Sequence, residues 1–300
     1  MSELAKINGY DIRDKKLADM GTATSVNNVL LEDASGNFQK ITKDNFIKDT
    51  SHARTRATDF SLTDLSSAVA DQNLEKYGLH VGDEKTINGH TYVIAGLNPM
   101  KGTSTPYRLT QNHVGLIVIP HTTQAWNTSN STSASQNTQN TDGTWTTGTP
   151  GKGYAHCDLH YYLMNTLLPL VQTDLGSSHL YSHSKLLTID ITTSGYNRYG
   201  DATGCSSNWT WFSNQYISAL SEVQVYGSTV WSSSGYDTGE ACRQLDVFRV
   251  YNHTEIFGGE YPWLRDVVSS SHAAAAADGG TADTGTATHA YYVAALILFH

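Results

Sequence analysis

The chain has 300 residues, a formal net charge of -9 at pH 7 and a charged fraction of 16%, and it is rich in Ser, Thr, Asn, Gly and Tyr. The length allows one large domain or two modest ones, and the composition is typical of a β-rich, loop-rich extracellular or virion protein. Nucleic-acid binding is disfavoured because a phosphate-binding face needs clustered Lys and Arg. Membrane insertion is disfavoured because no apolar run is long enough to cross a bilayer.

The first residues, Met1 to Lys6, lack the basic start and the apolar centre of a secretion signal. A chain with the composition of an extracellular protein therefore shows no export route. Assembly into a virion and release by lysis would resolve this conflict. We accordingly expect the protein to be made in the host cytoplasm and located in a virion.

Residues 1–58 contain two hairpin patterns. Asn8-Gly9 lies between short apolar flanks, which is a strong signal for a tight turn, and Val29 to Ile41 reads as strand, turn, strand. So small a segment usually needs oligomerisation to be stable. Both stretches resemble the openings of phage tail-fibre and appendage proteins, which dock onto the particle or pair with their own copies. An attachment and oligomerisation segment and an ordinary hairpin subdomain both remain open.

Residues 59–78 have the pattern of a helical connector. Leu62, Leu65 and Val69 share one face, Asp59 or Ser61 can cap the start, and Gly78 can end the helix. Such a helix either packs on its own domain or joins copies of itself in a short bundle.

The main domain is expected to span residues 79–300. Asn88-Gly89 predicts a hairpin between Thr86-Ile87 and His90 to Ala95, and Gly115 to Pro120 predicts a short strand. Thr122 to Gly151 is polar and of low complexity, which indicates a long surface loop. Its two tryptophans, Trp126 and Trp145, either staple the loop to the body or present stacking faces to a ligand.

Two helices are expected in the middle of this domain. Asp158 can serve as the N-cap of a helix that continues to Leu168 and is stopped by Pro169, after which a short turn reaches Gly176. Further along, Ser221 and Gln224 match a capping box, and Gly227 can end that short helix.

The C-terminal part contains two motifs on which the domain is expected to depend. Trp263-Leu264-Arg265 suits a strand that anchors a core and ends near the surface, and Tyr291 to Phe299 suits a strand buried on both faces. Between them lies a stretch of Ala, Gly, Thr, Ser and Asp, which we expect to be an exposed excursion because its side chains are too small and polar to form a core.

These motifs, in this order, resemble the C-terminal signature of the C-type-lectin-like superfamily, in the bacterial and phage branch related to the formylglycine-generating-enzyme fold. The chain has Asp266 where that branch has Ser, and Val293 to Leu296 lack its Arg and Pro. The resemblance implies an α+β fold, a C-type-lectin-like domain of mostly antiparallel strands with short helices and long loops. It also implies that the N- and C-terminal strands pair on one side while the loops gather on the other.

No common catalytic pattern occurs in the sequence, since a nucleophile elbow, a phosphate-binding loop with Lys and a His-Glu-x-x-His motif are all missing. His156 and His160 have a spacing that places both on one helix face, but zinc needs three or four ligands. The odd set of Cys157, Cys205 and Cys242 favours free thiols over a disulfide framework, although a Cys205–Cys242 bridge stays open. We expect no catalytic residue, metal or cofactor.

Aromatic side chains among Ser, Asn and Gly are typical of recognition surfaces. We expect Trp211, Phe212 and Trp263 to lie in the core. The candidate ligand-binding residues are Tyr196, Asn197, Tyr199, Trp126, Trp145 and Tyr236.

Together these observations favour a bacteriophage virion structural protein, such as a fibre, a spike or a capsid decoration, that is not an enzyme. Its N-terminal segment would contact other virion proteins and form a homo-oligomer, expected to be a trimer. Its lectin-like domain would bind a glycan or protein of the host surface. The alternatives are a bacterial surface adhesin and a degenerate enzyme of the formylglycine-generating type.

Overall fold

The structure is a computed structural model. It describes residues 55–101, 109–132, 135–189, 209–231, 244–277 and 279–300, together with four short strands that precede residue 43. By its internal contacts the chain forms two units, Met1–Thr55 and Arg56–His300. Helices are few and most sheets are antiparallel, so the fold is α+β in the general sense. None of the helices described is both long and apolar enough to span a membrane.

The first unit contains the two predicted hairpins. Strand β1 (Lys6–Ile7) pairs with β2 (Tyr10–Asp11) in antiparallel fashion, with Ile7 opposite Tyr10. Strand β3 (Asn28–Glu32) pairs in antiparallel fashion with β4 (Phe38–Thr42). The two predicted strand pairings are therefore confirmed, whereas the residues of the turns themselves lie outside the described residues. A role of this unit in attachment or oligomerisation stays a prediction.

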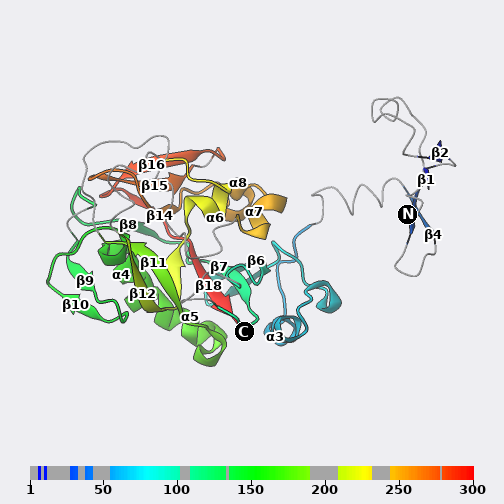
Figure 1. The fold of residues 1–300 in the computed structure, drawn as a ribbon, viewed down its shortest axis with the longest axis horizontal. Helices are drawn as coiled ribbons and strands as arrows, with labels where there is room; N and C mark the ends of the chain where they lie inside the picture. Colours follow the sequence, from blue (N-terminus) through cyan, green and yellow to red (C-terminus); the bar gives the residue numbers. More distant parts are fainter. Residues whose placement is uncertain are drawn as a thin grey trace. The chain divides into compact units, whose positions relative to one another are not determined.

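The second unit is built around a five-stranded antiparallel sheet (Figure 1). Its order is β13-β18-β7-β6-β5, so the C-terminal strand lies inside the sheet, as the apolar run predicts. The strands are β5 (Glu84–Ile87), β6 (His90–Leu97), β7 (Val114–Ile119), β13 (Ile217–Ala219) and β18 (Ala295–Phe299). The Asn88-Gly89 turn joins β5 to β6 with both residues at positive φ, as a tight primed turn requires.

Alternate residues of this sheet enter different hydrophobic cores. On β7, Leu116 and Val118 belong to the larger core, whereas Ile117 belongs to the second. On β18, Ile297 and Leu296 divide in the same way. The central strands β7 and β18 are buried on both faces, which explains why they read as continuous apolar runs. The edge strand β5 is mainly polar and only partly buried.

The predicted connector helix is part of the second unit. Helix α3 (Leu62–Asp71) is capped by Ser61, whose side chain accepts a hydrogen bond from the Asp64 amide. A 3-10 turn, η2 (Glu75–Tyr77), follows and ends at Gly78, which has positive φ. Leu65 and Val69 are buried in the larger core, so the helix packs on its own domain.

A long helical segment packs on the same side of the sheet, and it differs from its prediction. It consists of η3 (Tyr154–His156), α4 (Asp158–Tyr162), a π-helical turn η4 (Leu163–Leu167) and α5 (Leu168–Leu175), followed by η5 (Ser177–His179). Pro169 does not stop the helix but lies in the first turn of α5, where a missing N–H is tolerated. The wider π-helical turn η4, which ends just before α5, accommodates the proline ring within the continuous helical segment.

The stretch between the two C-terminal motifs is a correction to the sequence reading. Strands β14 (Trp263–Val267), β15 (His272–Ala276) and β16 (Ala282–Thr286) form a three-stranded antiparallel sheet. Ala273 to Ala276 are fully buried and alternate between the two cores, so this part of the excursion is interior. Small side chains are required here because bulky neighbours occupy both faces. Arg265 is likewise buried and not near the surface.

The remaining elements described in the second unit are three two-stranded pairs and three short helices. Two-stranded pairs are formed by β8 (Thr123–Ala125) with β17 (Ala290–Tyr292), by β9 (Asn137–Gln139) with β10 (Trp145–Thr147), and by β11 (His183–Thr188) with β12 (Trp209–Gln215). The short helices are α6 (Glu222–Tyr226), α7 (Asp246–Val250) and α8 (His253–Phe257). The capping box of Ser221 and Gln224 is present, and Gly227 ends α6, both as predicted.

Candidate functional site

The polar stretch 122–151 is attached to the body of the domain at several points. Trp126 follows β8 and is completely buried, with its ring centroid 6.3 Å from that of Tyr154 and its carbonyl accepting from the Leu159 amide. Of the two roles predicted for Trp126, the structure shows the staple. A ligand-binding role for this ring is wrong because no face of it reaches solvent.

A buried carboxylate holds the next part of the stretch. Asp158 is not the N-cap of α4, which is Cys157. Instead one oxygen of Asp158 accepts from the amide and the hydroxyl of Thr128, at 2.8 and 2.9 Å, and the other accepts from the Gln136 amide. Asn127 completes the clasp by accepting from the Asp158 amide and donating to the Ser131 carbonyl. Hydrogen bonds to a carboxylate are about twice as strong as neutral ones, so this loop has a defined shape.

The hairpin of β9 and β10 is fixed to the helical segment by two histidines. Nδ1 of His156 accepts from the Gln139 amide at 2.9 Å. Nε2 of His160 faces the side-chain oxygens of Gln139 and Gln215, at 3.2 and 3.0 Å. Burial lowers the pKa of His156 to about 4 and that of His160 to about 3, so both rings are neutral at pH 7.

Trp145 of the same hairpin packs edge-on against Tyr161, with ring centroids 5.0 Å apart, and also contacts His160. Its side chain is half-buried. The second tryptophan is therefore also a staple, but one whose ring remains partly open to solvent. Part of the predicted surface loop is thus a hairpin that rests on α4.

The turn of this hairpin is docked on β12. The Ser213 amide donates to the Thr141 carbonyl, and the Asn214 side chain donates to the Asp142 carbonyl. Asp142 in turn accepts from the amide and hydroxyl of Thr144. The outward surface, which we call the polar hairpin face, consists of the exposed residues Asn140, Thr141, Asp142, Thr144, Thr146 and Thr147. In Figure 1 the hairpin lies at the end of the second unit opposite α3.

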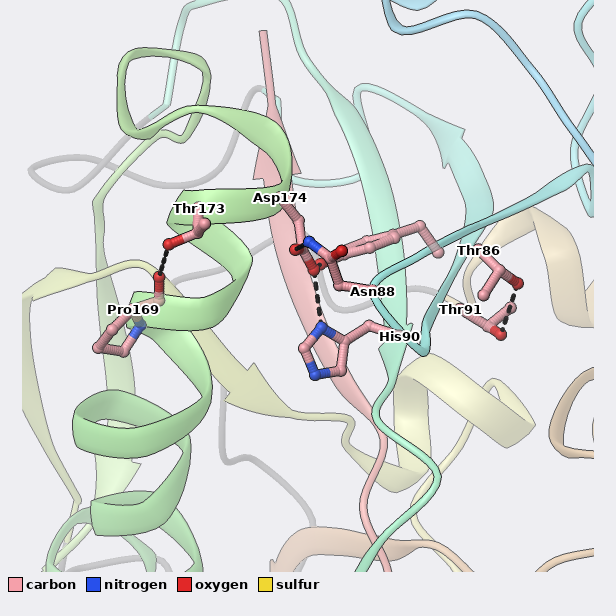
Figure 2. A network of polar contacts seen from close by, with 8 residues as sticks. Thr86, Asn88, His90, Thr91, Pro169, Thr173 and Asp174 are labelled. Atoms are coloured by element: carbon pink, nitrogen blue, oxygen red, sulfur yellow. Dashed lines mark hydrogen bonds and ion pairs between the residues drawn. The ribbon is translucent and has the colours of Figure 1, made fainter.

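A second polar cluster lies between α5 and the β5–β6 hairpin (Figure 2). Asp174 accepts hydrogen bonds from the side chains of Asn88, His90 and Tyr92, at 2.8, 2.7 and 2.5 Å. Burial raises the pKa of Asp174, but these three hydrogen bonds outweigh it and leave the pKa below its usual value. We interpret this cluster as a structural tie between the helix and the sheet, because each of its hydrogen bonds joins α5 to the β5–β6 hairpin.

Neither cluster has the composition of a metal site. Among the residues that the structure describes, no three His, Cys, Asp or Glu side chains come close enough together to hold an ion. His156 and His160 instead face the amide and side chain of Gln139, as above. The thiol of Cys157 is completely buried, and burial raises its pKa, so it lacks the character of a reactive cysteine.

The other candidate residues, Tyr196, Asn197, Tyr199 and Tyr236, lie outside the described residues, as do Cys205 and Cys242. Phe212 and Trp263 lie in the core, as predicted, whereas Trp211 is half-buried. Sequence reasoning missed Asp158 as a loop clasp and missed Gln139 and Gln215. No local signal marks them, because these hydrogen bonds join residues that lie 17 or more positions apart in the chain.

Comparison of the chain with protein-family models gave no match. Searches of curated proteins and of solved structures also gave none.

Proposed function

We propose that the protein is a bacteriophage virion protein whose second unit binds the surface of the host cell through the polar hairpin face. The observation that carries this proposal is the attachment of a polar, low-complexity stretch to a rigid body by buried side chains. A binding surface held in its bound shape loses less conformational entropy when a partner arrives. Side chains of Asn, Thr and Asp supply adaptable hydrogen bonds to such a partner. The protein would act by binding alone, without catalysis.

The arrangement of the second unit supports this assignment. The chain enters this unit at Arg56, which contacts Glu84 of β5 and the carbonyl of Glu255 in α8. In Figure 1 the β9–β10 hairpin lies at the end of the unit opposite α3, the first helix after Arg56. A unit attached through its entry point would therefore present the hairpin outward.

We further propose that the second unit is a C-type-lectin-like domain. Its support is the central position of the C-terminal strand, the Trp263-Leu264-Arg265 strand in a second sheet, and the small number of helices. One feature departs from the resemblance: β18 pairs with β7 and β13, whereas β5, the first strand of this unit, lies at the edge of the sheet. No structural observation favours the adhesin or the degenerate enzyme.

The first unit is proposed to attach the protein to other virion proteins and to form a homotrimer. Its two short hairpins are too small to bury a core of their own. We expect light scattering of the full chain to give the mass of an oligomer, with three copies as the expected number. A monomer at micromolar concentration, with the first unit protected from proteolysis, would contradict this.

The binding role is tested by removing surface side chains. We expect Thr146→Ala with Thr147→Ala to weaken attachment to host cells, and Tyr196→Ala with Tyr199→Ala to weaken it at least about tenfold, since a central aromatic contributes about 2 kcal/mol or more. Melting temperatures should stay nearly constant. Thr63→Ala, at an exposed position of α3, is the matched control. Normal attachment by the threonine double variant would refute a role of the polar hairpin face in binding. Normal attachment by the tyrosine double variant would refute the predicted role of Tyr196 and Tyr199.

A further inference from the structure

The bond between His156 and the hairpin depends on protonation. Nδ1 of His156 accepts the Gln139 amide hydrogen, and only the neutral ring has a lone pair at that atom. A protonated ring would carry a hydrogen there, directed at the amide hydrogen of β9. The same geometry that attaches the hairpin at neutral pH would therefore repel it when the ring is charged.

The contact between His160 and the hairpin also depends on protonation, but for a different reason. Its Nε2 donates towards the side-chain oxygens of Gln139 and Gln215, which leaves the other nitrogen, Nδ1, without a hydrogen. That Nδ1 is buried and has no hydrogen-bond partner among the residues described. Protonation would place an unsatisfied charged N–H in the interior, which costs far more than exposing it to water.

No neighbouring charged group among the described residues offsets the free-energy cost of protonating these two buried imidazoles. His156 contacts the ring of Phe212 on β12 and packs against Gly151, and burial alone accounts for its lowered pKa. His160 contacts the rings of Tyr154 and Trp145. The charges of Lys185 and Arg265, and that of His156 once its ring is protonated, further disfavour a cation at His160. Neither imidazole has a carboxylate partner within the described part of the chain, and Asp158 is engaged by Thr128 and Gln136.

From this geometry we propose that the β9–β10 hairpin is an acid-released clip. It is closed while His156 and His160 are neutral, and it detaches from the helical segment when they are protonated. The release itself is independent of any ligand, whereas its effect on binding rests on the proposed recognition role of the polar hairpin face.

The direction of the pH dependence follows from proton linkage. In the closed hairpin burial lowers the pKa of His156 from 6.5 to about 4, and that of His160 to about 3, whereas in the released hairpin the rings return towards 6.5. The released form binds more protons, so closure is complete above about pH 6.5 and weakens by up to about tenfold per pH unit per histidine as the pH falls towards about 4.

The test is hydrogen–deuterium exchange on the full chain between about pH 7 and pH 4, corrected for the intrinsic pH dependence of exchange. We expect the amides of β9 and β10 to lose at least tenfold protection in acid, while those of β6 and β18 keep theirs. The double variant His156→Asn with His160→Gln places amide groups near Nδ1 and Nε2 and does not titrate. It should keep the hairpin protected at low pH.

His121→Asn is the matched control, because His121 is exposed and its positive φ suits Asn. This variant should open in acid as the unmodified chain does. Unchanged protection of β9 and β10 in the unmodified chain at about pH 4 would overturn the proposal, even if the double variant failed to fold. An equal loss of β9 and β10 protection in acid by the double variant would also overturn it. If the hairpin is released in acid but attachment to cells does not change, the acid-released clip stands. The hairpin is then not part of the surface that binds host cells.

Discussion

Replacing Trp263 by Ala is expected to destabilise the second unit by about 3–5 kcal/mol, the usual cost of truncating a large buried ring. Trp263 is completely buried on β14 and its ring lies 4.5 Å, centroid to centroid, from that of Tyr291. Its Nε1 donates to the Gln124 carbonyl at 2.8 Å, which ties the three-stranded sheet to β8 at the start of the polar stretch. Both the packing and this tie are lost in the variant.

Chemical denaturation followed by fluorescence and circular dichroism would measure this effect. Trp263→Phe keeps a buried ring and removes the indole N–H, so it should cost clearly less than Trp263→Ala. A loss below about 1 kcal/mol for Trp263→Ala would show that the ring does not hold the sheet and β8 together.

The second large effect is expected at Gly285 of β16. A Cβ placed there would lie 2.6 Å from the ring of Trp263 and 2.6 Å from that of Tyr291. Both rings are packed, so neither can move without disturbing its neighbours. Gly285→Ala should therefore destabilise the second unit by about 1–3 kcal/mol, as overpacking of a filled core does.

Gly279→Ala provides the control for the intrinsic effect of this substitution, because nothing lies within 4 Å of the added carbon and Gly279 does not have positive φ. It should be neutral or slightly stabilising, since alanine lowers the entropy of the unfolded chain. The two variants are compared by their denaturation midpoints. Equal stability of both would mean that the aromatic pair yields to a methyl group.

The burial of Gly285 and of the four alanines of β15 differs from the exposed excursion that the sequence predicts. Small and polar side chains predict an exposed stretch here, whereas Ala273 to Ala276 are buried. Their burial follows from what covers them: Trp263 is paired opposite Ala275, and alternate alanines enter the two cores. Large neighbours that are distant in sequence make small side chains the ones that fit.

The helix across Pro169 departs from the sequence prediction for a related reason. A proline in a helical pattern normally marks an end, and local rules cannot foresee a π turn that realigns the helix before it. The buried face of this segment, with Leu159, Leu163, Leu167 and Val171 in the larger core, holds the chain helical on both sides of the proline.

By itself, the sequence determined the elements whose cause is local. The β1–β2 pairing, the primed turn at Asn88-Gly89, the Ser61 cap of α3, the capping box of α6 and the buried C-terminal strand all follow from residues adjacent in the chain. Only the tertiary structure decided how the polar stretch is used. Trp126, Asp158, His156 and His160 hold it through contacts between distant residues, and the free energy of those contacts depends on burial that no local pattern encodes.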